Sequence, residues 1–191
     1  MKKKVLIISI CLCLVLIAAG GTIAYFTAES PIYHNVITTG GVDVELLEYR
    51  DREKKNPFED VDGMMPGMST GKVPVMKNTG EKPAWVCIKL EKRIELAEGS
   101  DIQEPDTGLI ELDLNTSDWV TEDGVYYYYK HILQPGEETD PTLFTTVTIN
   151  KDMPNGYKRS KIMVDLTGYA VQSDHNGTDG DPLSVKGWPF K

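Results

Sequence analysis

The sequence contains only three cysteines among its 191 residues. Cys11 and Cys13 lie in an apolar stretch near the N-terminus, so Cys87 stands alone in the rest of the chain. A single cysteine cannot form an intramolecular disulfide, and the domain must therefore be stabilised by a sizeable apolar core. We expect Cys87 to be a buried thiol, with pairing between two chains as the alternative.

Histidine is equally scarce, and His34, His131 and His175 are far apart in the chain. Their spacing excludes the His-Glu-x-x-His pattern of zinc peptidases, and no glycine-rich phosphate loop occurs. We therefore expect surface histidines, no catalytic residue, no metal ligand and no cofactor. Residues 174–181 (DHNGTDGD) carry oxygen ligands of the calcium type, but Asp179 stands where a calcium loop needs glycine. A solvated acidic tail is the favoured interpretation, and calcium binding stays open.

Positive charge is also in short supply, since 20 Lys and Arg face 29 Asp and Glu, a net charge of −9. Removal of residues 1–24 would take away three lysines and no acid, which leaves 17 basic against 29 acidic residues, or −12. Such a chain repels phosphates, so nucleic acid is excluded as a partner. The remaining length fits one domain.

Charge of either sign is absent between Lys4 and Glu29, where Ile, Leu and Val dominate. A short positive start followed by such a run is typical of a secretory signal peptide, which is helical in the membrane. The small residues Thr22 and Ala24 suit a signal peptidase and predict cleavage between Ala24 and Tyr25. An uncleaved anchor is the alternative, because the run is just long enough to span a bilayer.

Residues 20–27 (GGTIAYFT) resemble the signal junction of the TasA/camelysin family of Gram-positive bacteria. Residues 123–129 (DGVYYYY), residues 133–136 (LQPG), Thr139 and residues 143–144 (LF) are similar to that family as well. The resemblance implies export through a SipW-type signal peptidase and a jelly-roll β-sandwich. It also implies a structural role as a fibre-forming subunit of the biofilm matrix. Camelysin is described as a metallopeptidase, so a camelysin-like metallopeptidase is a further alternative, although the resemblance carries no catalytic residue onto this chain.

After the signal, helical periodicity is missing, and short apolar segments alternate with turns. This pattern predicts an all-β fold of the sandwich type, which the resemblance makes jelly-roll-like. The clearest strand covers residues 85–96, in which Val86 and Ile88 face one side while Trp85 and Cys87 face the other. Further strands are expected at residues 42–46, 72–78, 109–114, 143–149 and 158–172.

Asp123 and Gly124 lie between two β-rich runs, which predicts a hairpin. Its second strand contains four consecutive tyrosines, residues 126–129, and places two on each face. The apolar phase changes after Gly168, so we expect a β-bulge there. Residues 50–69 are expected to form a loop.

The chain thus divides into four expected segments. Residues 1–24 form the signal peptide, residues 25–40 an extended segment, residues 41–172 the β-sandwich, and residues 173–191 an acidic, Gly- and Asp-rich, mobile tail. The protein is expected outside the cell, in the extracellular matrix or at the cell surface, with the membrane involved only for the precursor.

The extended segment suggests a mode of assembly. Residues 25–38 could fill an open sheet edge of a neighbouring copy, with Phe26, Ile32, Val36 and Ile37 as the side chains for pockets. A head-to-tail contact of this kind does not close and produces filaments, so the main expected partner is the chain itself. Two alternatives remain: the segment folds back as the first strand of its own domain, or the protein is a monomeric surface adhesion module.

Overall fold

The structure is a computed structural model that describes residues 36–39, 41–61, 63–177 and 181–190. For residues 36–39 it describes the backbone only. Within these residues ten strands and three short 3₁₀ helices occur, without any α-helix. The all-β prediction is therefore confirmed. The expected signal peptide lies outside the described residues.

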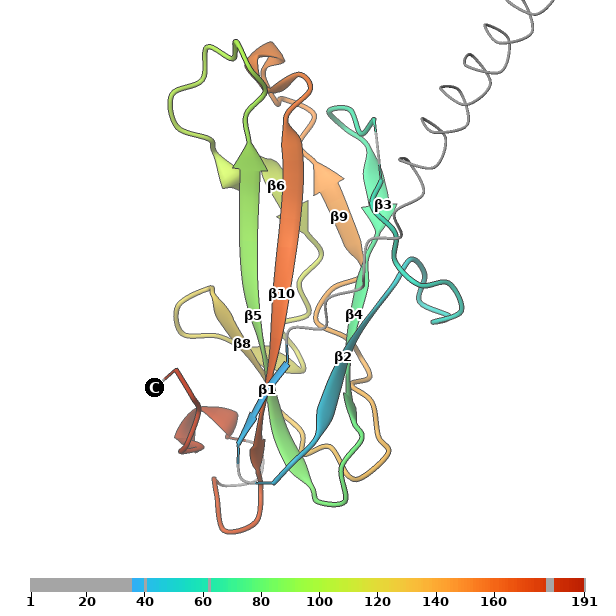
Figure 1. Cartoon of the computed structure of the whole chain (residues 1–191), viewed down its shortest axis with the longest axis vertical. Helices are drawn as coiled ribbons and strands as arrows, with labels where there is room; N and C mark the ends of the chain where they lie inside the picture. The colour runs from blue at the N-terminus through green and yellow to red at the C-terminus, as the bar shows by residue number, and fades with distance from the viewer. Residues whose placement is uncertain (1–35, 40, 62, 178–180, 191) are drawn as a thin grey trace, which may run out of the picture. The chain divides into compact units, whose positions relative to one another are not determined.

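The larger sheet has the strand order β1-β10-β5-β8-β7. Its centre is a long antiparallel pair of β5 (Ala84–Glu95) and β10 (Lys161–Gln172), which run side by side in Figure 1. On one flank lie β8 (Tyr126–Tyr129) and β7 (Trp119–Val120). On the other flank β1 (Val36–Thr39) is parallel to β10, whereas every other pairing in this sheet is antiparallel.

The second layer consists of two small sheets, β2-β4 and β3-β9-β6. Only Lys72 separates β3 (Ser69–Gly71) from β4 (Val73–Asn78), and its N–H donates to the carbonyl of Thr145 at 3.0 Å. The N–H of Thr139 likewise donates to the carbonyl of Met76 in β4. The two small sheets therefore form one continuous layer. Its other strands are β2 (Val44–Tyr49), β6 (Ile110–Leu112) and β9 (Thr146–Ile149).

The main core lies between the two layers. The larger sheet contributes Val86 and Ile88, and β2 and β4 contribute Leu46 and Met76. The alternation predicted for β5 is confirmed, because Trp85 and Cys87 belong to a separate cluster on the outer face. Because side chains alternate between the two faces of a strand, β5 contributes side chains to two apolar clusters.

The predicted hairpin is confirmed as β7 paired with β8. Gly124 has a φ of +72°, which explains why glycine occupies the turn. Tyr127 and Tyr129 point into the main core, while Tyr128 lies in the outer cluster and Tyr126 packs against it. The tyrosine run therefore places two rings on each face, as its alternation indicates.

The bulge predicted at Gly168 is wrong. β10 pairs with β5 in unbroken register, and Gly168 lies opposite Ile88. The apparent change of phase has a different cause: Leu166 and Ala170 face the main core, while Tyr169 and Val171 face an outer cluster that begins only beyond Gly168.

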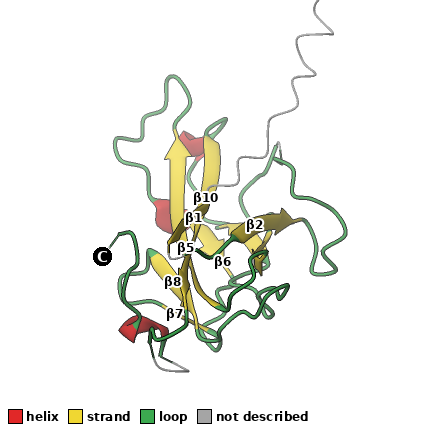
Figure 2. Cartoon of the chain, turned by 60° about the horizontal axis from the view of Figure 1, so that its bottom comes forward, coloured by secondary structure: helices red, strands yellow, loops and turns green. Residues whose placement is uncertain are grey.

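The expectation of a mobile tail is also wrong for residues 181–190, which we call the C-terminal strap. The strap contains η3 (Pro182–Ser184) and buries Val185 and Trp188 against the outer face of the larger sheet. Figure 2 shows it with its short 3₁₀ helix in red, near β7 and β8. Cys87 lies in the same cluster and is 0% exposed, so its predicted burial is confirmed.

Candidate functional site

The outer edge of β10 is the most distinctive backbone feature of the domain. β10 has twelve residues, but β1 has only four and covers residues 168–171. Within the described part of the chain, no strand pairs with residues 161–167 on that side. Unpaired backbone N–H and C=O groups on a sheet edge are a ready template for another strand.

The two layers approach each other closely where β1 begins. Val36 lies opposite Gly168, and a Cβ at Gly168 would lie 2.8 Å from the sulfur of Met76 and 3.4 Å from the Cβ of Leu46. A side chain at this position would require the end of Met76, or β2 and β4 with it, to shift. Glycine therefore permits the close approach of the two layers at Gly168, where the open part of the edge ends and the pairing with β1 begins.

Beyond this point the edge carries apolar side chains that are not fully covered. Ile162 and Val164 pack against the main core but remain half-buried. On the other layer, Leu47 of β2 is also half-buried, and β2 contacts both β1 and β10. The open edge thus combines unpaired backbone groups with apolar surface, which are the two requirements for strand addition.

The outer face of this edge carries an ion pair. The Nε of Arg93 donates to a carboxylate oxygen of Asp165 at 2.7 Å, and this hydrogen bond raises the pKa of Arg93. Both side chains are largely in solvent, so their contribution to stability is small.

The residues predicted for assembly are only partly described. Ala24, Tyr25, Phe26 and Ile32 lie outside the described residues. Val36 and Ile37 belong to β1 and pair with the same chain's β10, opposite Gly168 and Tyr169. The alternative of an ordinary first strand is thus what Val36–Thr39 adopts in this structure.

No family model, curated protein or solved structure matches this chain. Its function must therefore be argued from its own geometry.

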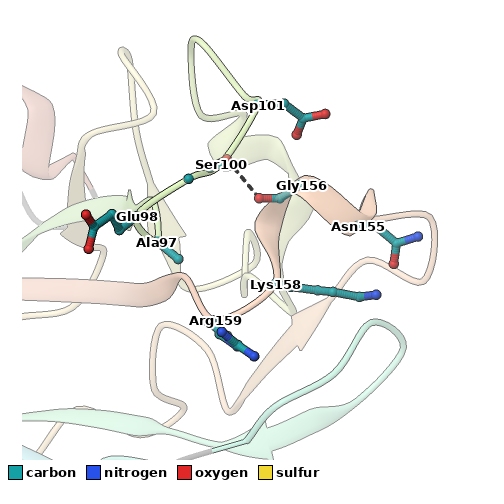
Figure 3. A pocket seen from close by; sticks show the side chains of 9 residues that line it. Ala97, Glu98, Ser100, Asp101, Asn155, Gly156, Lys158 and Arg159 are labelled. Atoms are coloured by element: carbon teal, nitrogen blue, oxygen red, sulfur yellow. Dashed lines mark hydrogen bonds between the residues drawn. The ribbon is translucent and has the colours of Figure 1, made fainter.

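A second candidate is the polar hollow of about 450 Å³ between the loop after β5 and η2 (Asn155–Tyr157) (Figure 3). The carboxylates of Glu98 and Asp101 point away from each other, and Lys158 points away from both. The hydroxyl of Ser100 donates to the carbonyl of Gly156 at 2.8 Å and so joins the two loops. This arrangement offers no converging acid and base groups.

Among the described residues, no three His, Cys, Asp or Glu side chains lie close enough to hold a metal ion. His131 is largely exposed and contacts a carboxylate oxygen of Asp118 at 3.1 Å, and this hydrogen bond lowers the pKa of Asp118. His175 adopts a positive φ in a turn, and His34 lies outside the described residues.

In the part of the chain that the structure describes, no helix has the length and apolar character needed to cross a membrane. The expected membrane-crossing segment, residues 1–24, lies outside that part.

Sequence reasoning missed the C-terminal strap. The available signal was four apolar side chains, Leu183, Val185, Trp188 and Phe190, in an otherwise largely polar tail. Phe190 stacks on Tyr126 with ring centroids 3.9 Å apart, and Trp188 meets Tyr128 edge-on at 5.4 Å. Because these residues lack strand periodicity, their spacing alone does not indicate what they cover.

Proposed function

We propose that this protein is an exported structural subunit of extracellular fibres. Its strands are arranged as a jelly-roll-like sandwich, and residues 1–24 act as a signal peptide that a SipW-type peptidase removes after Ala24. Residues 25–38 of one copy then add to the outer edge of β10 in the next copy. The resemblance of residues 20–27 and 123–129 to the TasA/camelysin family supports the matrix role.

The single observation that carries this proposal is the open edge of β10. Residues 161–167 have no described strand partner, and half-buried Ile162 and Val164 lie beside them. The four residues of β1 pair in parallel with residues 168–171, the next part of the same edge. A strand this short is easily displaced, since few backbone hydrogen bonds must be exchanged.

The parallel register also explains why exchange gains contacts. If a donor strand continued the register seen for Val36–Thr39, each donor residue before Val36 would pair with one residue before Gly168 on β10. A donor strand that pairs in this register with a neighbour has the whole of residues 161–167 available to it. In this register Ile32 of the donor would lie opposite the half-buried Val164, whereas Phe26 would lie opposite Lys158, before β10 begins.

The deciding experiment removes residues 25–38 from the mature protein and compares filament formation by electron microscopy. The truncated protein should unfold cooperatively but stay monomeric. If it forms the same filaments as the mature protein, strand donation is wrong.

A second arm locks β1 in place. Thr38 lies opposite Ala170, so a disulfide in T38C/A170C would hold β1 on its own β10. We expect no filaments under oxidising conditions and filaments after reduction, with each single cysteine variant as a control. Filaments that form equally well in the locked state would show that β1 need not leave.

A monomeric surface module is the second candidate, and the pairing of β1 within its own chain favours it. Under this alternative the mature protein remains a monomer over a wide range of concentration and pH. Light scattering of the mature protein therefore separates the two functions.

A further inference from the structure

Three methionines surround a tight turn between β2 and β3. Met65 and Met68 are 62% and 44% exposed, and they are the large apolar side chains that the described residues leave most open to solvent. Met64 precedes them and is half-buried. Neither Met65 nor Met68 belongs to either apolar cluster, so packing does not explain their presence.

The backbone holds the two exposed methionines in a fixed relation. The N–H of Met68 donates to the carbonyl of Met65 at 3.0 Å, which closes a β-turn. Pro66 and Gly67 occupy its centre, and Gly67 has a φ of +83°, as the third position of a type II turn requires. The first and fourth Cα atoms of such a turn lie within about 7 Å of each other, so both thioethers start from neighbouring points.

The turn is also anchored to the sheet. The N–H of Gly67 donates to the carbonyl of Ile149 at 2.8 Å, and the N–H of Ile149 donates to the carbonyl of Met68 at 2.9 Å. These bonds extend the pairing of β3 with β9. The turn is therefore a fixed backbone support, and the backbone would lose little further conformational entropy if both side chains engaged one ligand.

Thioether sulfur is a soft, uncharged ligand that selects Cu(I) over hard cations such as calcium and magnesium. The ligands are uncharged, so the site needs no neighbouring carboxylate to hold a soft monovalent cation. We propose that this turn is a surface site for a soft monovalent cation, Cu(I), with Met65 and Met68 as ligands and Met64 as the available third thioether.

The test uses Ag(I), a redox-stable probe with the same ligand preference, in chloride-free buffer. Cys11 and Cys13 are replaced by serine in the full chain, because their thiols would compete, while Cys87 is buried. Calorimetry should give one Ag(I) per chain, and M65L/M68L should weaken binding at least about tenfold. Anaerobic Cu(I), measured against a chromophoric chelator, should behave in the same way.

The controls separate ligation from packing. Leucine keeps the size and apolar character of methionine, so M65L/M68L should melt at the parent temperature. M163L, on β10, should leave Ag(I) affinity unchanged. In ¹³C-methyl spectra, Ag(I) should shift the signals of Met65 and Met68 but not that of Met76, which is fully buried. Unchanged affinity in M65L/M68L, or an absence of binding by the parent, would overturn the proposal. If M65L/M68L kept its Ag(I) affinity but no longer formed fibres, the proposal would also be wrong, and the turn would instead be a contact between subunits.

Discussion

The C-terminal strap shields Cys87, and the replacement W188A should remove that shield. Trp188 is 2% exposed and packs edge-on against Tyr128 and alongside Phe190. Its indole N–H is buried without a hydrogen-bond partner among the described residues, so the replacement removes packing and leaves no partner unsatisfied. Truncation of a buried tryptophan to alanine costs about 3–5 kcal/mol.

This loss should appear mainly as opening of the strap, because the strap follows the last strand and can leave without breaking the pairing between any of the ten named strands. With about 1.4 kcal/mol for each factor of ten, a loss of about 3 kcal/mol raises the open population about 100-fold. Labelling of Cys87 by a thiol reagent should therefore become about 100-fold faster in native buffer. The rate is followed by absorbance or by mass spectrometry.

W119A is the matched control. Trp119 is also 2% exposed, but it lies in the main core, where its indole N–H donates to the carbonyl of Pro141 at 3.2 Å. Its loss should make labelling depend on global unfolding and hence rise steeply with urea, whereas labelling of W188A should depend on urea only weakly. Wild-type labelling rates in W188A would refute the idea that the strap protects Cys87.

Two further outcomes follow from individual contacts. The carboxylate of Asp113 accepts hydrogen bonds from the N–H groups of Thr145 and Thr146 at 2.8 and 2.7 Å. Burial acts to raise the pKa of Asp113, but the hydrogen bonds from these two residues outweigh burial, so the pKa is lowered. Since the pKa is depressed in the folded state, this stabilisation is present above pH about 4 and is lost as the pH falls through the lowered value. D113N should therefore cost about 1 kcal/mol at neutral pH, a modest figure because the side chain is 41% exposed, and the difference from wild type in urea unfolding should shrink below pH about 4. G168A should cost about 1–3 kcal/mol, because its methyl group would lie 2.8 Å from the sulfur of Met76; an unchanged melting temperature would show that Met76 moves aside freely.

Several features could be predicted from the sequence because they depend on local order. The two faces of β5 follow from strict alternation around Val86, Cys87 and Ile88, and the structure places Val86 and Ile88 in one apolar cluster and Cys87 in the other. The hairpin at Gly124 follows from turn chemistry between two β-rich runs. Such signals extend over only a few residues, so no knowledge of distant contacts is needed to interpret them.

The candidate site is different, because it depends on which distant segments meet. Composition suggested that residues 25–40 are extended, but only the tertiary structure decided that Val36–Thr39 pairs in parallel with β10. It also decided that residues 161–167 have no partner on that side among the strands described. The role of Gly168 was likewise hidden, since a glycine in a strand suits a bulge as well as a close approach of two layers. The position of the strap also became clear only from the tertiary structure. The alternation of Tyr169 and Val171 indicates that the outer face of β10 is apolar, but it does not indicate which segment packs on that face. Local sequence order determines the faces of strands, whereas the edge of a sheet and the cover of a face are determined by contacts between segments far apart in the chain.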